Sequence, residues 1–253
     1  MGKFHCKPAL AAAISETITS SEVEEKTDNE AMYLKVLERD PRNVEALKVI
    51  FYGKMRSGKT EEAVKYVERL IEIEPVEVEW KLLQALNYEM LGELSKAKRL
   101  FEDILVDRPL LLRALHGLAM VMHKNHEDAE LFEMLSKALE VARSENRVTE
   151  ERNIRILIAQ MNVVKGDLEE GLKKFQELVD DNPRDFRPYL CQGIIYSLLD
   201  KAKEAEEQFE IYRSLIPDEF PQRGFLDDVV LAAKTESHDQ LKKEFEAQFS
   251  YRK

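Results

Sequence analysis

Apolar and charged side chains alternate along most of this chain with the spacing of amphipathic helices. In EEAVKYVERLIEI (residues 61–73), apolar residues recur every three or four positions and charged residues fill most positions between them. Segment 185–217 gives the clearest pattern and reads as two helices placed back to back. Pro217 ends the second helix, because proline cannot continue one. The pattern predicts pairs of antiparallel helices and no strand longer than a few residues.

The helix pairs recur with a fixed period. Pro41, Pro75 and Pro109 are 34 residues apart, as are Pro183 and Pro217, and the 74 residues from Pro109 to Pro183 equal two periods plus six inserted residues. Further positions keep this register: a turn glycine (Gly58, Gly92, Gly166), small residues (Ala85, Ala159, Gly193; Ala63, Ala97, Gly171, Ala205) and bulky ones (Tyr33, Val67, Phe101, Phe175, Phe209). Small residues let two helices approach closely, and glycine suits the turn between them. A 34-residue period of this kind is the signature of the tetratricopeptide repeat.

The predicted fold is all-α, a tetratricopeptide α-solenoid of about five helix-turn-helix repeats with an N-terminal half-repeat and C-terminal capping helices. We expect a disordered or frayed lead-in over residues 1–27 and one solenoid domain over 28–234. Its parts are a half-unit at 28–41, full units at 44–75, 78–109, 112–151, 152–183 and 186–217, and a cap at 223–234.

Three local expectations follow from the register. Phe51 and Lys54 stand at the small and aromatic positions of the first full unit, so that helix pair should pack less tightly. The third unit should absorb the insertion by extending its second helix. Residues 235–253 should form an amphipathic helix whose stripe of Leu241, Phe245 and Phe249 lies against the last first helix, at Leu190, Ile194 and Leu198.

Composition limits the classes of partner. Acidic residues outnumber basic ones 49 to 38, and the net charge of −11 argues against a nucleic-acid partner, which is held by clustered Lys and Arg. The two cysteines, Cys6 and Cys191, are too few for a disulfide framework, and Cys191 is expected to be a small buried thiol. No apolar run approaches the length of a membrane span, so membrane association would require a segment that precedes this chain.

One motif offers an alternative function. The stretch GKMRSGKT, Gly53 to Thr60, matches the phosphate-loop pattern, with Lys59 for the outer phosphates and Thr60 for magnesium. The repeat register disfavours this hypothesis, because Gly58 falls at the predicted turn and Thr60 then reads as a helix N-cap. A nucleotide fold also needs several parallel strands. We therefore expect a non-enzymatic protein without a cofactor and keep nucleotide binding as the alternative.

No other cluster predicts chemistry. His116, His123 and His126 lie in one unit, but two ligands on one helix face fall short of a closed zinc site. The carboxylates lie mostly on charged helix faces, and no nucleophile stands beside a base. We expect neither a catalytic residue nor a metal site.

The first helices of a tetratricopeptide stack line its inner side, so their residues that face away from the second helices are candidates for partner binding. By register, the predicted protein-binding groove consists of Lys48, Tyr52, Leu82, Leu83, Leu86, Arg113, His116, Met120, Ile156, Leu157, Gln160, Arg187, Leu190 and Ile194. Most are apolar, which predicts a groove for a hydrophobic or helical segment of another protein. Part of this surface could instead be core between successive units.

Chaperone-tail-binding members of the superfamily hold a terminal carboxylate with Lys, Asn and Arg. Here only Lys48 and Arg113 resemble that clamp, and Tyr52, Leu83 and Gly117 stand at its other positions. Hsp70 or Hsp90 tails are therefore not expected as partners.

The sequences EWKLLQALNYEMLGELSKAKRLFEDIL, RILIAQ and DFRPYLCQGIIYSLLDKAKEAEEQFEIYRSLIP resemble the plant chloroplast tetratricopeptide proteins of the SLOW GREEN 1 type. The resemblance covers roughly residues 44–230. It implies a role in chloroplast development or in the assembly of chloroplast protein complexes, without catalytic residues. Members of that family carry a transit peptide, which this chain lacks, so chloroplast localisation rests on the resemblance and a cytoplasmic location is the alternative.

Three functional hypotheses follow. The first is a protein-protein interaction scaffold that holds a partner segment in its groove. The second is a nucleotide-binding protein that uses Lys59. The third is a structural repeat protein that associates with itself.

Overall fold

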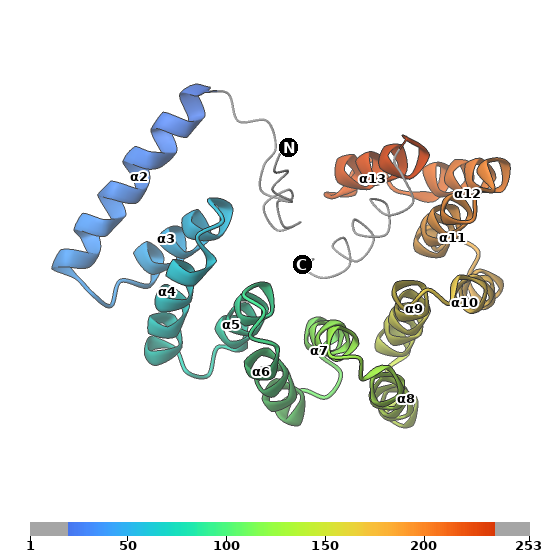
Figure 1. The fold of residues 1–253 in the computed structure, drawn as a ribbon, viewed down its shortest axis with the longest axis horizontal. Coiled ribbons are helices and arrows are strands. Elements are labelled where there is room, and N and C mark those ends of the chain that lie inside the picture. The colour runs from blue at the N-terminus through green and yellow to red at the C-terminus, as the bar shows by residue number, and fades with distance from the viewer. Residues whose placement is uncertain (1–19, 236–253) are drawn as a thin grey trace. The chain divides into compact units, whose positions relative to one another are not determined.

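The computed structural model describes residues 20–235, and within that range it contains twelve α-helices and no strand (Figure 1). These residues group into two compact units that divide between Asn125 and His126, inside the third predicted repeat. Unit 1 contains α2 (Ser20–Arg39), α3 (Val44–Arg56), α4 (Thr60–Ile73), α5 (Val78–Met90), α6 (Leu94–Asp107) and α7 (Leu112–Lys124). Unit 2 contains α8 (Asp128–Ser144), α9 (Val148–Lys165), α10 (Leu168–Asp181), α11 (Phe186–Leu198), α12 (Ala202–Leu215) and α13 (Arg223–Thr235). The all-α prediction is confirmed. None of the helices in the described range is long and apolar enough to cross a membrane.

Within each unit, the two helices of a repeat pack against each other as the register predicts. In unit 1, α3 packs on α4 and α5 on α6, and in unit 2, α9 packs on α10 and α11 on α12. A second helix ends two residues before Pro75, Pro109, Pro183 and Pro217 in turn. The first helices of neighbouring repeats also contact each other, α5 with α7 and α9 with α11, whereas no comparable contact joins second helices in the part of the chain described. We call the side of each unit on which these first helices meet the first-helix face.

The small and large positions of the repeat meet where two helices approach. A Cβ atom added to Gly193 in α11 would lie 2.4 Å from Cε1 of Phe209 in α12, and Phe209 itself is fully buried. The turns between paired helices require a left-handed residue, and Gly58, Gly92 and Gly166 supply it with φ angles of +70°, +77° and +98°. At the same register position in the other two repeats, His126 and Asp200 take this conformation with φ angles of +60° and +58°.

The N-terminal part of unit 1 differs from the expectation in two ways. Helix α2 begins at Ser20, so residues 20–27, expected to be disordered or frayed, continue the predicted half-unit as helix. The first full repeat is not loosely packed: Phe51 is buried, and α3 and α4 contact each other as extensively as α5 and α6 do. The reason is that Lys54, at the aromatic position, is itself buried between two carboxylates, those of Glu30 and Glu62.

The six inserted residues lengthen two helices rather than one. Helix α8 has 17 residues where the other second helices have 14, and α9 has 18 where the other first helices have 13. The boundary between the predicted units 112–151 and 152–183 therefore lies earlier, at the turn before Val148. Asn146 makes that turn with a φ angle of +54°.

Helix α13 falls at the position of the predicted cap 223–234. Its buried side chains are Leu226, Val229, Val230 and Ala233, and it packs against α11. The predicted lead-in over residues 1–19 and the terminal stripe of Leu241, Phe245 and Phe249 lie outside the described residues.

Candidate protein-binding surface

The fourteen residues predicted to line the groove fall on the first helices of both units. Eight of them belong to α3, α5 and α7 of unit 1, and six belong to α9 and α11 of unit 2. Figure 1 shows α5 and α7 on one side of unit 1 with α6 on the other, and α9 and α11 against α10 in the same way in unit 2. The register therefore assigned these residues to the correct helices.

Most of these side chains are buried. Ten of the fourteen are under 9% exposed, namely Leu82, Leu83, Leu86, His116, Met120, Ile156, Leu157, Gln160, Leu190 and Ile194. Only four, all polar, are partly exposed: Lys48, Tyr52, Arg113 and Arg187. Packing between elements accounts for part of this burial, since Leu83 belongs to the hydrophobic core formed with α3 and α4. The accessible residues among these fourteen are thus polar, whereas the sequence predicted a largely apolar groove.

In unit 1, Arg113 and Tyr52 lie beside Glu79, a residue that sequence reasoning missed. Nη1 of Arg113 in α7 lies 2.5 Å from Oε2 of Glu79 in α5, and the Nζ of Lys48 lies 5.1 Å from the centre of the Trp80 ring. The other carboxylate oxygen of Glu79, Oε1, is buried and has no hydrogen-bond partner among the described residues. Burial raises the pKa of the Tyr52 hydroxyl, the Glu79 carboxylate raises it further and Arg113 opposes both. Tyr52, Glu79 and Arg113 therefore form one cluster across three first helices.

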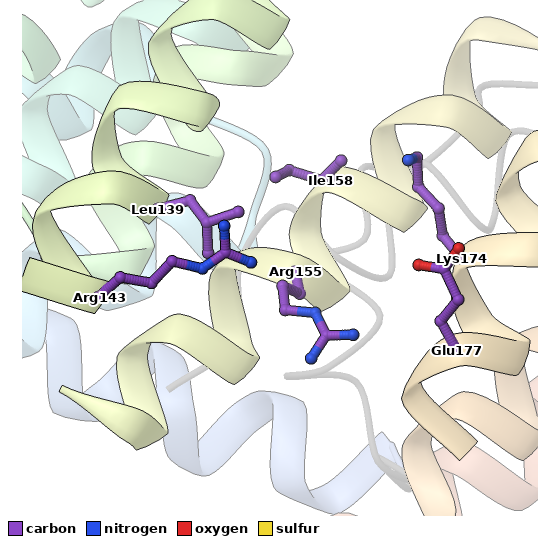
Figure 2. Close-up of a pocket in the computed structure, with 6 residues that line it drawn as sticks. All are labelled: Leu139, Arg143, Arg155, Ile158, Lys174 and Glu177. Carbon is purple, nitrogen blue, oxygen red and sulfur yellow. The ribbon is translucent and has the colours of Figure 1, made fainter. Parts of the chain in front are cut away.

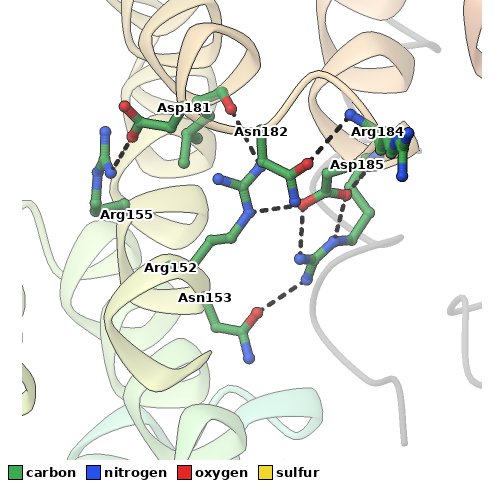
Figure 3. A network of polar contacts seen from close by, with 9 residues as sticks. Arg152, Asn153, Arg155, Asp181, Asn182, Arg184 and Asp185 are labelled. Atoms are coloured by element: carbon green, nitrogen blue, oxygen red, sulfur yellow. Dashed lines mark hydrogen bonds and ion pairs between the residues drawn. The ribbon is translucent and has the colours of Figure 1, made fainter. Parts of the chain in front are cut away.

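Unit 2 carries a second polar cluster, at the N-terminal end of α11 (Figure 3). Asp185 accepts hydrogen bonds from both Arg187, at 2.9 and 2.8 Å, and Nε of Arg152, at 2.8 Å. Nη1 of Arg187 also donates to Oδ1 of Asn153 in α9, at 2.8 Å. Burial acts to raise the pKa of Asp185, but the two arginines outweigh it and hold that pKa below its usual range. Arg187 was predicted to contact a partner protein. In the structure its guanidinium group is hydrogen-bonded to Asp185 and Asn153 of unit 2.

The sequence contained a signal for both clusters. Glu79 and Arg113 are one period apart, as are Asn153 and Arg187, and each pair joins the first helices of successive repeats. Complementary polar residues separated by 34 positions could have identified these contacts before the structure was known.

Sequence comparison bears on the identity of this repeat protein. Over 228 residues the chain is 40% identical to the protein SLOW GREEN 1, chloroplastic, of Arabidopsis thaliana, and the match covers 89% of this chain and 72% of that protein. The chain belongs to the SLOW GREEN 1 family. No protein-family model matches it.

Comparison with solved structures bears on the fold of this SLOW GREEN 1 family member. A tetratricopeptide repeat protein from Parabacteroides merdae is 16% identical, with a TM-score of 0.55 over 90% of this chain and 96% of that chain. BtubC from P. vanneervenii is 13% identical, with a TM-score of 0.52 over 79% and 91% of the two chains. At these identities the two structures show the tetratricopeptide-like fold and nothing more.

The stretch Gly53–Thr60 does not form a phosphate loop in this member of the SLOW GREEN 1 family. Its first four residues lie in α3, so their amide groups bond within the helix instead of pointing at a ligand. Lys54 lies 2.6 Å from Glu62 and 2.9 Å from Glu30, and hydrogen bonds to these carboxylates raise its pKa. Thr60 is not the N-cap that we expected: it is the first residue of α4, after Lys59.

Of the remaining candidate groups, His116 and Cys191 are buried, whereas His123 is partly exposed and His126 is exposed. Burial lowers the pKa of His116 to about 4, and His123 and His126 join it in no group of three or more possible metal ligands in the described range. Cys191 is a buried free thiol, as predicted, and burial raises its pKa to about 12 although Gln160 hydrogen-bonds to it. Neither group is placed to act on a ligand at the surface.

Proposed function

We propose that this protein is a non-enzymatic scaffold of the chloroplast that binds a segment of another protein on the first-helix face of unit 1. The tetratricopeptide-like fold supports a binding role. Family membership supports the location, since the relative from Arabidopsis thaliana is described as chloroplastic.

The observation that carries the proposed site is the unpaired oxygen Oε1 of Glu79. A buried acceptor without a donor costs about 1–3 kcal/mol, so a partner group that donates a hydrogen bond to this oxygen would be favoured there. Arg113 already occupies the other oxygen and fixes the direction of the carboxylate. We propose that a lysine, an arginine or an amide of the partner supplies this donor.

The surroundings of Glu79 support the same kind of partner. Tyr52, Lys48 and Arg113 remain partly exposed around it, and the buried leucines Leu82, Leu83 and Leu86 hold α5 in place beneath. The net charge of −11 favours the approach of a basic segment. We propose that a basic segment bound here places an apolar side chain on Tyr52 and, farther along α5, a second one on Met90. Both are partly exposed and pack on the unit 1 core.

We do not propose Hsp70 or Hsp90 tails, which bind through a carboxylate clamp, as partners. Of the two residues that resemble the clamp, Arg113 is paired with Glu79 and Lys48 lies over the Trp80 ring. A terminal carboxylate would have to compete with both contacts.

The test is affinity capture from a chloroplast extract with three forms of the full chain. Glu79→Gln keeps an oxygen for Arg113 but puts an NH₂ group in place of Oε1, so the acceptor becomes a donor. We expect the partners captured by the unaltered chain to be lost with Glu79→Gln. They should be kept with Glu72→Gln, a matched change of an exposed glutamate in α4.

Circular dichroism melting of both variants checks that the fold is retained. Equal capture by the two glutamine variants would refute the proposed site. Capture that needs ATP and disappears in Lys59→Ala would favour the nucleotide hypothesis, and a chain that only self-associates in sedimentation experiments would favour the structural one.

A further inference from the structure

The Glu79 carboxylate in unit 1 offers a ligand one oxygen rather than two. Nη1 of Arg113 lies 2.5 Å from Oε2, whereas Oε1 is buried and has no hydrogen-bond partner among the described residues. The Glu79 side chain as a whole is 28% exposed. A donor that approaches from the surface can therefore pair with Oε1 alone, and it has to reach below the surface to do so.

This unpaired oxygen distinguishes the Glu79 site from a cavity of about 180 Å³ that opens in unit 2 between α8, α9 and α10 (Figure 2). Each of the three cations that line the cavity is paired with a carboxylate: Arg143 with Glu151, Arg155 with Asp181, and Lys174 with Glu170. An acid, Glu177, lines the cavity as well. The charges around the cavity are thus used within the chain and do not select a ligand.

The single open oxygen of Glu79 discriminates between the two basic side chains. The guanidinium group of arginine is a planar fork that binds a carboxylate best through both oxygens. At Glu79 the fork would need Oε2, which Arg113 already occupies, and it would bring a second guanidinium group beside that of Arg113. The ammonium group of lysine is a compact charge on a flexible stem, so it can reach one recessed oxygen. The geometry of the carboxylate thus favours lysine over arginine.

The neighbourhood of Tyr52 favours a charged donor over a neutral amide. Burial raises the pKa of the Tyr52 hydroxyl most, and the Glu79 carboxylate then raises it by more than Arg113 lowers it. The pairing with Arg113 therefore leaves a negative potential on this side of Glu79, where a cation forms a stronger hydrogen bond than an amide does. The Tyr52 ring is partly exposed and packs edge-on against Phe51, with 5.1 Å between the ring centres. Such a ring suits both the methylene groups and the ammonium group of a lysine.

We propose that the Glu79 site anchors its partner through a lysine and discriminates against arginine at that position. This inference rests on the proposed function, because it specifies the donor that pairs with Oε1. The ammonium group of the partner's lysine binds Oε1, and its methylene groups pack on Tyr52. Glu79 supplies the acceptor, and Arg113 is the residue that determines specificity, because it blocks the oxygen that an arginine fork needs.

An NMR titration of the isotope-labelled full chain tests this selectivity. The probe is the capped peptide acetyl-Leu-Lys-Ala-Ala-Leu-amide, and its matched controls carry arginine or norleucine in place of lysine. We expect the lysine peptide to shift resonances of α3, α5 and α7 around Glu79. It should bind about fivefold or more tightly than the arginine peptide, because the fork loses one of its two contacts. The norleucine peptide, which lacks the charge, should bind most weakly.

Arg113→Met tests the role of the blocked oxygen. Without Arg113 both oxygens of Glu79 are open to a fork, so the arginine peptide should gain on the lysine peptide and the preference for lysine should disappear. Arg99→Met, a change of an exposed arginine in the second helix α6, should keep the preference. Circular dichroism melting of both variants checks that the fold is retained.

Two results would overturn the selectivity and leave the proposed site in place. The first is equal binding of the lysine and arginine peptides that Glu79→Gln abolishes, and the second is an unchanged preference for lysine in Arg113→Met. If neither peptide shifts these resonances, or if Glu79→Gln leaves the binding of both unchanged, the proposed site is refuted together with its selectivity. The failure of this inference is therefore distinguishable from the failure of the proposed function.

Discussion

At the scale of the residue, burial decides the protonation state of His116 in unit 1 and of Cys191 in unit 2. The His116 imidazole and the Cys191 thiol are both neutral near pH 7, because burial disfavours their charged forms. The sequence offers His116 as a possible metal ligand and predicts Cys191 to be a buried thiol, and in the structure both side chains are buried. Their protonation therefore bears on stability rather than on binding.

The His116 imidazole predicts a dependence of stability on pH. Its pKa is about 4 in the folded chain and 6.5 in the unfolded chain, so between these values the unfolded state binds more protons and stability falls as the pH falls. Between pH 7.5 and 5 this group alone should lower the free energy of unfolding by about 2 kcal/mol. Denaturant unfolding at the two pH values measures the loss.

His116→Gln should remove this part of the pH dependence, because glutamine does not titrate. His126→Asn is the matched control, since His126 is exposed in a left-handed turn that asparagine also adopts. A pH dependence that is the same in both variants would show that His116 is not its source.

At the scale of the element, neighbouring helices depend on positions where the backbone of one approaches a ring on the other. Gly193 of α11 faces Phe209 of α12, and Gly117 of α7 faces Phe101 of α6, where an added Cβ atom would lie 2.3 Å from Cζ of the ring. Both rings are fully buried and surrounded by other core residues. They cannot move aside without disturbing their own neighbours.

Gly193→Ala should therefore destabilise the chain by about 1–3 kcal/mol, because the strain exceeds the gain in helix propensity of about 1 kcal/mol. Thermal unfolding followed by circular dichroism measures the change. Gly224→Ala in α13 is the control, since nothing lies within 4 Å of its added Cβ and the variant should be unchanged or slightly more stable. If the two alanine variants had equal melting temperatures, the assigned contact would be wrong.

The helices also show which parts of the fold could be predicted from the sequence. The helix pairs, their turns and their proline ends followed from the 34-residue register. The division of the insertion did not, because the segment SENRVTEERN has no proline or glycine to mark the turn that Asn146 makes. The register predicted which residues of α5 face away from α6. It could not show that one of them, Leu83, is buried in the core with α3 and α4. Contacts between repeats join residues that are far apart in the sequence. The spacing of apolar residues within one helix therefore does not predict them.

At the scale of the whole molecule, stability in a repeat protein is a sum over neighbouring elements, and terminal elements have fewer neighbours. Helix α2 is such an element in unit 1 and packs against α3. Lys54 of α3 lies between Glu30 of α2 and Glu62 of α4, so one buried ammonium group connects three helices. The attachment of the terminal helix thus depends on a charge cluster as well as on apolar contacts such as that of Leu37.

Lys54→Met should loosen α2 without unfolding the rest of unit 1, because methionine fills the space but cannot pair with Glu30 and Glu62. We expect faster amide hydrogen exchange over residues 30–39, while exchange in α5 and α6 stays close to that of the unaltered chain. Lys59→Met, a change of an exposed lysine in the adjoining turn, should have no such effect. Exchange that is equally fast in both variants would show that the cluster does not hold α2.

Because Cys191 is buried in α11, the reactivity of its thiol reports how often this helix moves away from its neighbours. A thiol with a pKa of about 12 has almost no thiolate near pH 8, and a disulfide reagent reaches it only when the helix moves away from its neighbours. In a Cys6→Ser background Cys191 is the one thiol of the chain. The rate at which this thiol is modified then measures how often unit 2 opens at α11, and a bound partner that slows the modification reveals that it closes this part of the molecule.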